Sequence, residues 1–183
     1  MLALAATAEA QIERQHGAHV HGEATGFMAV DGQRLQVQLS LPGHNLVGFE
    51  HPPRNERQQQ AFDQAIAVLN SDDWLRFTPA ARCVVTSVTA TSQGFGVDDH
   101  TDSEHTHDHD HHDHDQSDHD HGGHAQVDVS GQVECARPEL LTWAELRLFA
   151  AFPNNAQLTV DVLTDQAAFQ ARLTPNIQRI DWP

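Results

Sequence analysis

The sequence predicts an α+β protein with a mostly antiparallel sheet, one or two helices and a long disordered loop rich in His and Asp. Three observations lead to this class. Several segments alternate apolar and polar residues with a period of two, as strands with one buried face do. One segment spaces its apolar residues as a helix does. A run of only His, Asp and one Thr, residues 105–115, has no apolar residue to bury and cannot be core.

The first predicted element is a hairpin over residues 26–42. Its turn is placed at Asp31-Gly32, a dipeptide favoured in two-residue hairpin loops. Apolar residues alternate with Gln and Ser along the second arm, which predicts a strand with one buried face. These apolar residues are Leu35, Val37, Leu39 and Leu41.

A helix is predicted over residues 54–70, because Phe62, Ile66 and Leu69 recur at helical spacing after the start signal Pro52-Pro53. Strand patterns follow, and the connections are short enough to favour antiparallel pairing. The remaining predicted elements are strands at 82–92 and 125–135, a strand from residue 143 that ends in a turn at Pro153-Asn154, and a closing hairpin over 157–175.

The chain divides around its His/Asp-rich tract. Residues 1–10 end in Ala8-Glu9-Ala10, the small-residue pattern of a signal peptidase site, and are interpreted as the remnant of a secretory signal peptide. Residues 11–93 form an N-terminal β-rich half with one helix. Residues 94–124 form the disordered metal-binding loop, and residues 125–183 form a C-terminal β-rich half. Such a signal predicts an exported protein.

Charge excludes several classes of function. The formal net charge is −16, from 26 acidic and 10 basic residues, and the sequence has Arg but no Lys. Such a chain would be repelled by nucleic acid, and it lacks the Lys of phosphate-binding loops and Schiff-base enzymes. No segment approaches the ~20 apolar residues of a membrane span, so no membrane insertion is expected.

Two cysteines, Cys83 and Cys135, lie in predicted strands on either side of the tract. An even number of cysteines in an exported protein favours a disulfide, which would close the loop that contains the tract. Two buried free thiols are the alternative. A shared metal site is less favoured, since neither cysteine belongs to a CxxC pair.

The tract is the strongest functional signal. Residues 100–124 contain ten His, seven Asp and one Glu, and no basic residue. Imidazole and carboxylate groups both bind zinc, and a His-rich composition is typical of metal binding. Alternating ligands permit many sets of three or four, so we expect several exchanging zinc ions. The candidate ligands here are His105, His107, His109, His111, His112, His114, His119, His121 and His124.

Two further clusters supply candidate ligands for an ordered site. The segment "HGAHVHGEA" contains His16, His19, His21 and Glu23, and a strand over 18–24 would place the last three on one face. The segment "GFEHPP" contains Glu50 and His51, of which His51 is the candidate. His44 has little support as a ligand from sequence.

These segments, together with the tract, "HAQVDVSGQVEC" and "LFAAFPN", resemble the ZrgA-type periplasmic zinc-uptake proteins. The resemblance covers nearly all of residues 16–180. It implies zinc binding in the periplasm in support of zinc acquisition, and it implies His19, His21 and His51 as candidates for an ordered site. The chain departs from this family in lacking Lys and in its short signal segment.

The sequence therefore predicts a periplasmic protein that binds Zn²⁺, captures or buffers it, and supports its uptake by an import transporter or that transporter's binding protein. The first alternative is a nickel or copper metallochaperone or store, because ligand type alone does not exclude these ions. The second is a metal-dependent hydrolase. No nucleophile motif, phosphate-binding loop or HExxH is present, so we expect no enzyme. The oligomeric state is left open.

Overall fold

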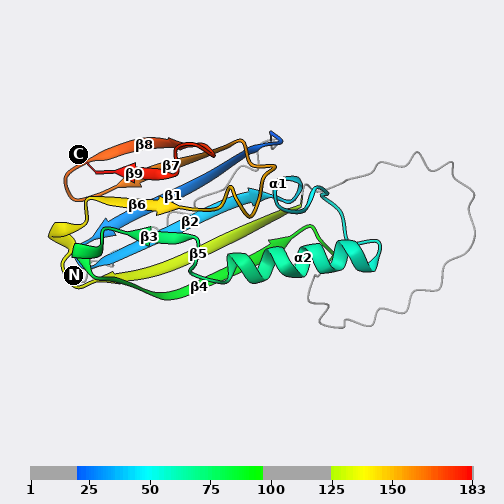
Figure 1. Ribbon diagram of the computed structural model, residues 1–183, viewed down its shortest axis with the longest axis horizontal. Helices are drawn as coiled ribbons and strands as arrows, with labels where there is room; N and C mark the ends of the chain where they lie inside the picture. Colours follow the sequence, from blue (N-terminus) through cyan, green and yellow to red (C-terminus); the bar gives the residue numbers. More distant parts are fainter. Residues whose placement is uncertain (1–19, 97–124, 183) are drawn as a thin grey trace, which may run out of the picture.

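The computed structural model describes residues 20–96 and 125–182. A six-stranded sheet forms one layer, in the order β4-β5-β2-β1-β7-β8 (Figure 1). Its strands are β1 (Glu23–Asp31), β2 (Arg34–Pro42), β4 (Cys83–Gln93), β5 (Gln126–Cys135), β7 (Gln157–Leu163) and β8 (Ala168–Leu173). Strands from both sides of the tract interleave in this sheet, so the two sides share one core.

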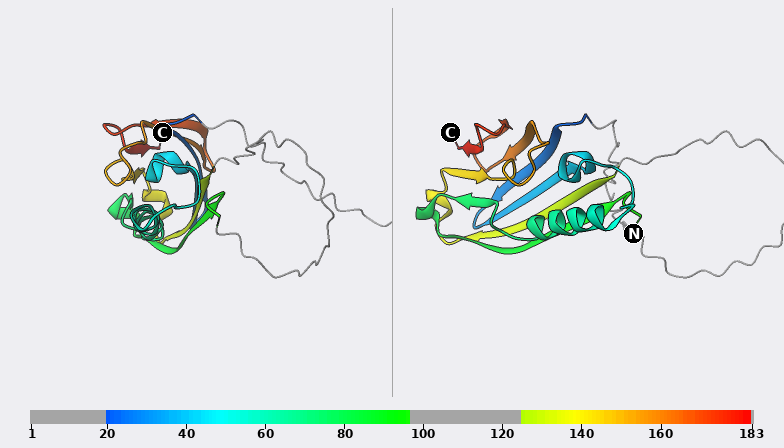
Figure 2. Two further views of the ribbon diagram at one scale, coloured as in Figure 1. Left: turned by 90° about the vertical axis from the view of Figure 1, so that its right-hand side faces the viewer. Right: turned by 45° about the vertical axis from the view of Figure 1, so that its right-hand side comes forward.

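Two helices and a small sheet form the second layer. Figure 2 shows the large sheet curving around them. The helices are α1 (Gly43–Val47) and α2 (Glu56–Leu69), and the small sheet has the order β3-β6-β9. Its strands are β3 (Leu75–Phe77), β6 (Trp143–Leu146) and β9 (Arg179–Asp181). Short 3₁₀ turns, Pro79–Ala81 and Pro138–Leu140, connect elements at one end of the molecule.

The predicted fold class is confirmed for the described residues. Every neighbouring pair of strands is antiparallel except β1 and β7, which run parallel. The disordered loop of the prediction lies outside the described residues. Within the described ranges, neither α1 nor α2 has the length and apolar composition of a membrane-spanning helix.

The alternation along β2 produces the core as predicted. Its four apolar side chains are at most 2 % exposed and face the second layer, while Gln36 and Gln38 between them are exposed. The predicted hairpin with β1 is confirmed, but its turn is not at Asp31-Gly32. Asp31 pairs with Arg34, so the two loop residues are Gly32 and Gln33, and Gly32 takes the positive φ of 56° that the turn requires.

The predicted helix is confirmed as α2, with a later start. Asn55 caps it by accepting a hydrogen bond from the backbone N–H of Gln58 at 3.0 Å, which a Ser, Asp or Asn side chain does well. The helix buries Phe62, Ala65 and Leu69 against the sheet.

The disulfide is also confirmed. Cys83 and Cys135 are bonded to each other and occupy paired positions on the neighbouring strands β4 and β5. The disulfide therefore joins β4 and β5 at the end of this strand pair that is away from the tract. The alternative of two free thiols is excluded in this structure.

Candidate metal centre

The described histidines gather at one end of the fold, around α1. The imidazole rings of His21 and His44 stack with their centroids 4.1 Å apart and their planes at 13°. Nε2 of His21 also lies 3.5 Å from Oε1 of Glu50. The Glu50 side chain is only 16 % exposed, whereas that of His21 is 61 % exposed. The three side chains form what we call the histidine cluster, with its carboxylate inside and an imidazole facing solvent.

His21 reaches this position because the chain turns just before β1. The backbone N–H of Glu23 donates to the carbonyl of Val20 at 3.0 Å, and Gly22 takes a φ of +86°. The strand expected over residues 18–24 is therefore wrong for His21, which lies in a turn. Because the strand begins only at Glu23, His21 and Glu23 are not placed on one face by strand alternation.

A buried amide fixes the backbone beside both stacked histidines. The Asn45 side chain is fully buried; its Oδ1 accepts from the N–H of Gly22 at 2.8 Å, and its Nδ2 donates to the carbonyl of Glu23 at 3.0 Å. Nδ2 also donates to Oδ1 of Asn155 at 3.0 Å. Gly22 follows His21 and Asn45 follows His44, so this network sets the separation of the two rings.

The described residues that flank the tract, Gly96 and Ala125, lie at the same end of the fold as the histidine cluster. The N–H of Gly43, the first residue of α1, donates to the carbonyl of Ala125 at 2.7 Å. A Cβ built on Gly96 would lie 2.8 Å from Cγ of Pro52, which places Gly96 against the residue after His51. The last described residue before the tract and the first after it therefore pack beside α1 and the segment that follows it.

His51 has a separate environment. Its ring stacks on Phe49 with centroids 5.1 Å apart, and its Nδ1 lies 2.8 Å from the carbonyl of Pro52. A carbonyl only accepts hydrogen bonds, so in the neutral ring Nδ1 carries the proton and Nε2 has the lone pair. Metal-binding histidines commonly donate their second ring N–H to a carbonyl in this way.

The structure describes only three of the candidate ligands from the sequence. His21 joins the histidine cluster, His51 lies against Phe49, and Glu23 is exposed at the start of β1. The remaining candidates lie outside the described residues. They are His16, His19, His105, His107, His109, His111, His112, His114, His119, His121 and His124.

The histidine cluster has suitable chemistry for a divalent cation but is not closed around one. Imidazole nitrogen and carboxylate oxygen are both zinc ligands. Two stacked rings cannot direct their in-plane lone pairs at one ion, so at least one ring must turn to bind. Over residues 20–96 and 125–182, no three His, Cys, Asp or Glu side chains already converge as a metal site.

Sequence reasoning missed His44 and undervalued Glu50. Both residues lie more than twenty positions from His21 in the sequence. They come close to it only because α1 packs against the start of β1. The available signal was Asn45, which follows His44 within a segment whose other residues are apolar, and which is fully buried. Buried amides need partners, so such a residue can indicate a structured polar site.

Comparison with known proteins gives one clear match. A family model described as ZrgA family zinc uptake protein matches residues 18–182, nearly the whole chain. No curated protein matches the sequence. The matched range contains the histidine cluster and the segments that flank it.

Proposed function

The chain belongs to the ZrgA family of zinc uptake proteins, and from this we propose that it captures or buffers zinc in the periplasm and passes it to an import system. The tract gathers zinc through many loosely held ligands. The histidine cluster holds one ion more firmly and forms the exchange point with the tract.

The observation that carries this proposal is the position of the cluster at the base of the tract. Gly43, which contacts Ala125, immediately precedes His44, and Gly96 packs on Pro52 beside His51. An ion released by the tract would therefore start close to the ordered ligands. Short separations raise the effective concentration of a ligand that is tethered to its site.

The ordered site is proposed to use His21, His44 and Glu50, with His51 as a further ligand. His19, two positions before His21, remains a candidate. Glu50 supplies a carboxylate that is already largely buried, and the exposed ring of His21 can turn out of its stack at little cost. Asn45 and Asn155 hold the backbone and lower the ordering entropy that binding would otherwise cost.

The proposal is tested by zinc titration of single variants against a competing chelator. His21→Ala, His44→Ala and Glu50→Gln should each weaken the tightest site by about tenfold or more, because each removes one ligand. Glu139→Gln is the matched control, since it makes the same chemical change on an exposed residue of the 3₁₀ turn Pro138–Leu140. If all four proteins bind zinc alike, the cluster is not the ordered site.

The two alternatives are separated by further measurements on the same samples. Competition between zinc, nickel and copper shows which ion the cluster selects, because nitrogen and oxygen ligands alone favour copper over zinc. A hydrolase would need an open coordination position and a general base. Turnover of ester, phosphate or amide substrates by the zinc-loaded protein, lost in Glu50→Gln, would favour the enzyme over the uptake function.

A further inference from the structure

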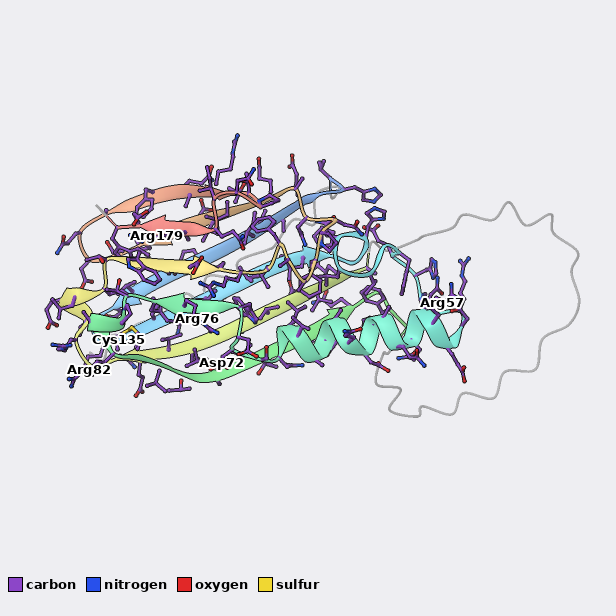
Figure 3. The ribbon with its side chains drawn as sticks, viewed as in Figure 1. Arg57, Asp72, Arg76, Arg82, Cys135 and Arg179 are labelled. Carbon is purple, nitrogen blue, oxygen red and sulfur yellow. A yellow bond between two sulfur atoms is a disulfide. The ribbon has the colours of Figure 1, made fainter. Side chains whose placement is uncertain are left out.

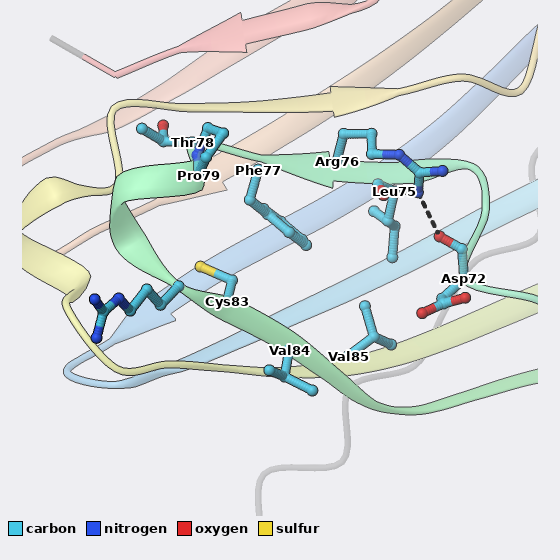
Figure 4. A pocket seen from close by; sticks show the side chains of 10 residues that line it. Asp72, Leu75, Arg76, Phe77, Thr78, Pro79, Cys83, Val84 and Val85 are labelled. Atoms are coloured by element: carbon cyan, nitrogen blue, oxygen red, sulfur yellow. Dashed lines mark hydrogen bonds between the residues drawn. The ribbon is translucent and has the colours of Figure 1, made fainter.

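A groove lies at the end of the fold opposite the histidine cluster, where the two sheets part between β3 and β4. It encloses about 370 Å³. Figure 4 shows Leu75 and Phe77 of β3 and Val85 of β4 along its walls. Leu75 is buried, whereas Phe77 and Val85 are partly exposed. The groove therefore presents two apolar side chains to solvent.

Both walls of the groove are strand edges. β3 pairs only with β6, and β4 pairs only with β5, so each has one side without a neighbouring strand among the described residues. An exposed edge offers backbone N–H and C=O groups to any extended chain that lies beside it. The groove thus combines an apolar wall with the backbone groups of a sheet edge.

The register shows which groups of β4 face the groove. The N–H of Ala136 donates to the carbonyl of Arg82, so residues 82 and 136 form a hydrogen-bonded pair. Hydrogen-bonded and non-hydrogen-bonded pairs alternate along antiparallel strands. Because Cys83 pairs with Cys135 and Val85 with Val133, the N–H and C=O groups of Cys83 and Val85 point away from β5 and toward the groove.

The rest of the β4 edge is partly covered. The N–H of Ala90 also points away from β5, and it donates to Oδ1 of Asn70 at 2.9 Å, just after α2. A bulge between Val85 and Ser87 separates the two stretches. Natural sheets commonly protect exposed edges by bulges and by side-chain caps. The stretch at Cys83–Val85 is left open beside the apolar wall.

Arg82 marks one end of the open stretch. It is the only residue other than glycine with positive φ in the described chain, at 53°. That conformation ends the 3₁₀ turn Pro79–Ala81, where the Arg82 N–H donates to the carbonyl of Pro79 at 3.2 Å, and it is strained for a residue with a Cβ. Arg82 lines the groove, is exposed, and has no ion pair within the described residues. Figure 3 shows it beside Cys135 at this end of the fold.

Arg76, the other cation of the groove, is already engaged. Its Nη1 donates to the carbonyls of Leu75 at 2.7 Å and Asp72 at 3.3 Å, and its Nη2 lies 3.8 Å from Oδ1 of Asp73. Arg82 is therefore the cation that can receive an anionic group from outside. In a chain of net charge −16, a cation that has no ion pair among the described residues and lies next to an apolar strand edge is a specific feature.

We propose that this groove binds an extended segment of a partner protein, which pairs as a strand with Cys83–Val85 and places a carboxylate on Arg82. The backbone of Cys83 and Val85 supplies the pairing, and the apolar wall receives alternate side chains of the segment. The site is remote from the histidine cluster, so a partner can dock here while the metal ligands stay accessible.

The test uses a display library of random peptides of about twelve residues, selected on the full chain. Selected peptides should share an Asp or Glu next to alternating apolar residues. They should bind wild type about tenfold or more tightly than they bind Arg82→Gly, because the variant lacks the cation that makes a charge-assisted hydrogen bond with the peptide carboxylate. The NMR signals of the backbone amides of Cys83 and Val85 should shift when a peptide binds. Methylating the peptide nitrogens that donate hydrogen bonds to β4 should abolish binding.

Arg82→Gly is suited to this test because glycine adopts positive φ without strain. The variant should unfold at the same or a higher temperature than wild type, so weaker binding would not reflect a damaged fold. His21→Ala should bind the peptides as wild type does, which keeps this result separate from the zinc site. The proposal is overturned if no peptide is selected, or if the selected peptides bind wild type and Arg82→Gly equally.

Discussion

Asn45 holds the backbone of Gly22 by a hydrogen bond of 2.8 Å from the Gly22 N–H to Oδ1, across a sequence separation of 23 residues. Asn45 is completely buried, so this bond and the two made by Nδ2 satisfy an amide that has no access to water. His44 directly precedes Asn45 and His21 directly precedes Gly22, and the rings of these two histidines stack on each other. One side chain outside the histidine cluster thus fixes the backbone next to two candidate ligands.

We predict that Asn45→Leu weakens both the fold and the ordered metal site. The change leaves the Gly22 N–H, the Glu23 carbonyl and Asn155 Oδ1 without this partner, and should lower the free energy of unfolding by about 2–4 kcal/mol. Zinc affinity of the tightest site should fall about 10–100-fold, as for other residues that orient ligands. Urea unfolding and chelator competition measure the two effects.

Asn176→Leu is the control for that change, because Asn176 is exposed in a turn and makes no hydrogen bond within the described residues that would be lost. It should leave stability within about 0.5 kcal/mol and zinc affinity unchanged. Were Asn45→Leu to lose stability but keep the affinity of the tightest site, Asn45 would support the fold without positioning the ligands.

Replacing residues 100–121 with a short Gly/Ser linker should remove most bound zinc but leave about one tight equivalent and an intact fold. Gln93 and Gln126 are paired, and a Cβ on Gly94 would lie 3.0 Å from Cα of Ala125, so the described chain on the two sides of the replaced segment comes together at this end of the fold. A shorter flexible loop has a smaller entropic cost of closure, so the fold should keep its stability. Metal analysis after dialysis gives the stoichiometry. Loss of all zinc would show that the ordered site does not exist.

Local patterns in the sequence predicted most of the fold, because hairpins and helices depend on neighbours in the chain. The alternation along β2 and the helical spacing of Phe62 and Leu69 have this origin. The parallel pairing of β1 with β7 could not be predicted this way, since it joins segments more than a hundred residues apart. For the same reason, the stack of His21 on His44 requires the tertiary contacts of Asn45 and Asn155 and has no signature in residue spacing.

The disulfide should contribute about 4 kcal/mol to the free energy of unfolding in the entropic model, given the 52-residue separation of Cys83 and Cys135. The double variant Cys83→Ala with Cys135→Ala should lose that amount in urea unfolding. Thiol counting on denatured, non-reduced wild type should find no free thiol. Because the bond lies far from α1, zinc affinity of the folded double variant should be unchanged; a large loss of affinity would indicate that the two ends of the fold are coupled.

Gly43 joins the histidine cluster to the base of the tract, and we predict that Gly43→Ala is poorly tolerated. Its Cβ would lie 2.6 Å from Cζ of Phe95 and 2.9 Å from the carbonyl oxygen of Phe49, closer than atoms can approach, and the second is backbone that cannot move aside cheaply. Overpacking of this kind costs about 1–3 kcal/mol. Displacing α1 would also move His44 away from His21, so the change should lower zinc affinity.

Gly131→Ala is the matched control, because its Cβ would meet Val37 at 3.7 Å, an ordinary contact. Thermal unfolding and chelator competition should be measured on both variants. Equal unfolding temperatures and equal zinc affinities would show that α1 can shift without cost and that its position does not determine the zinc site.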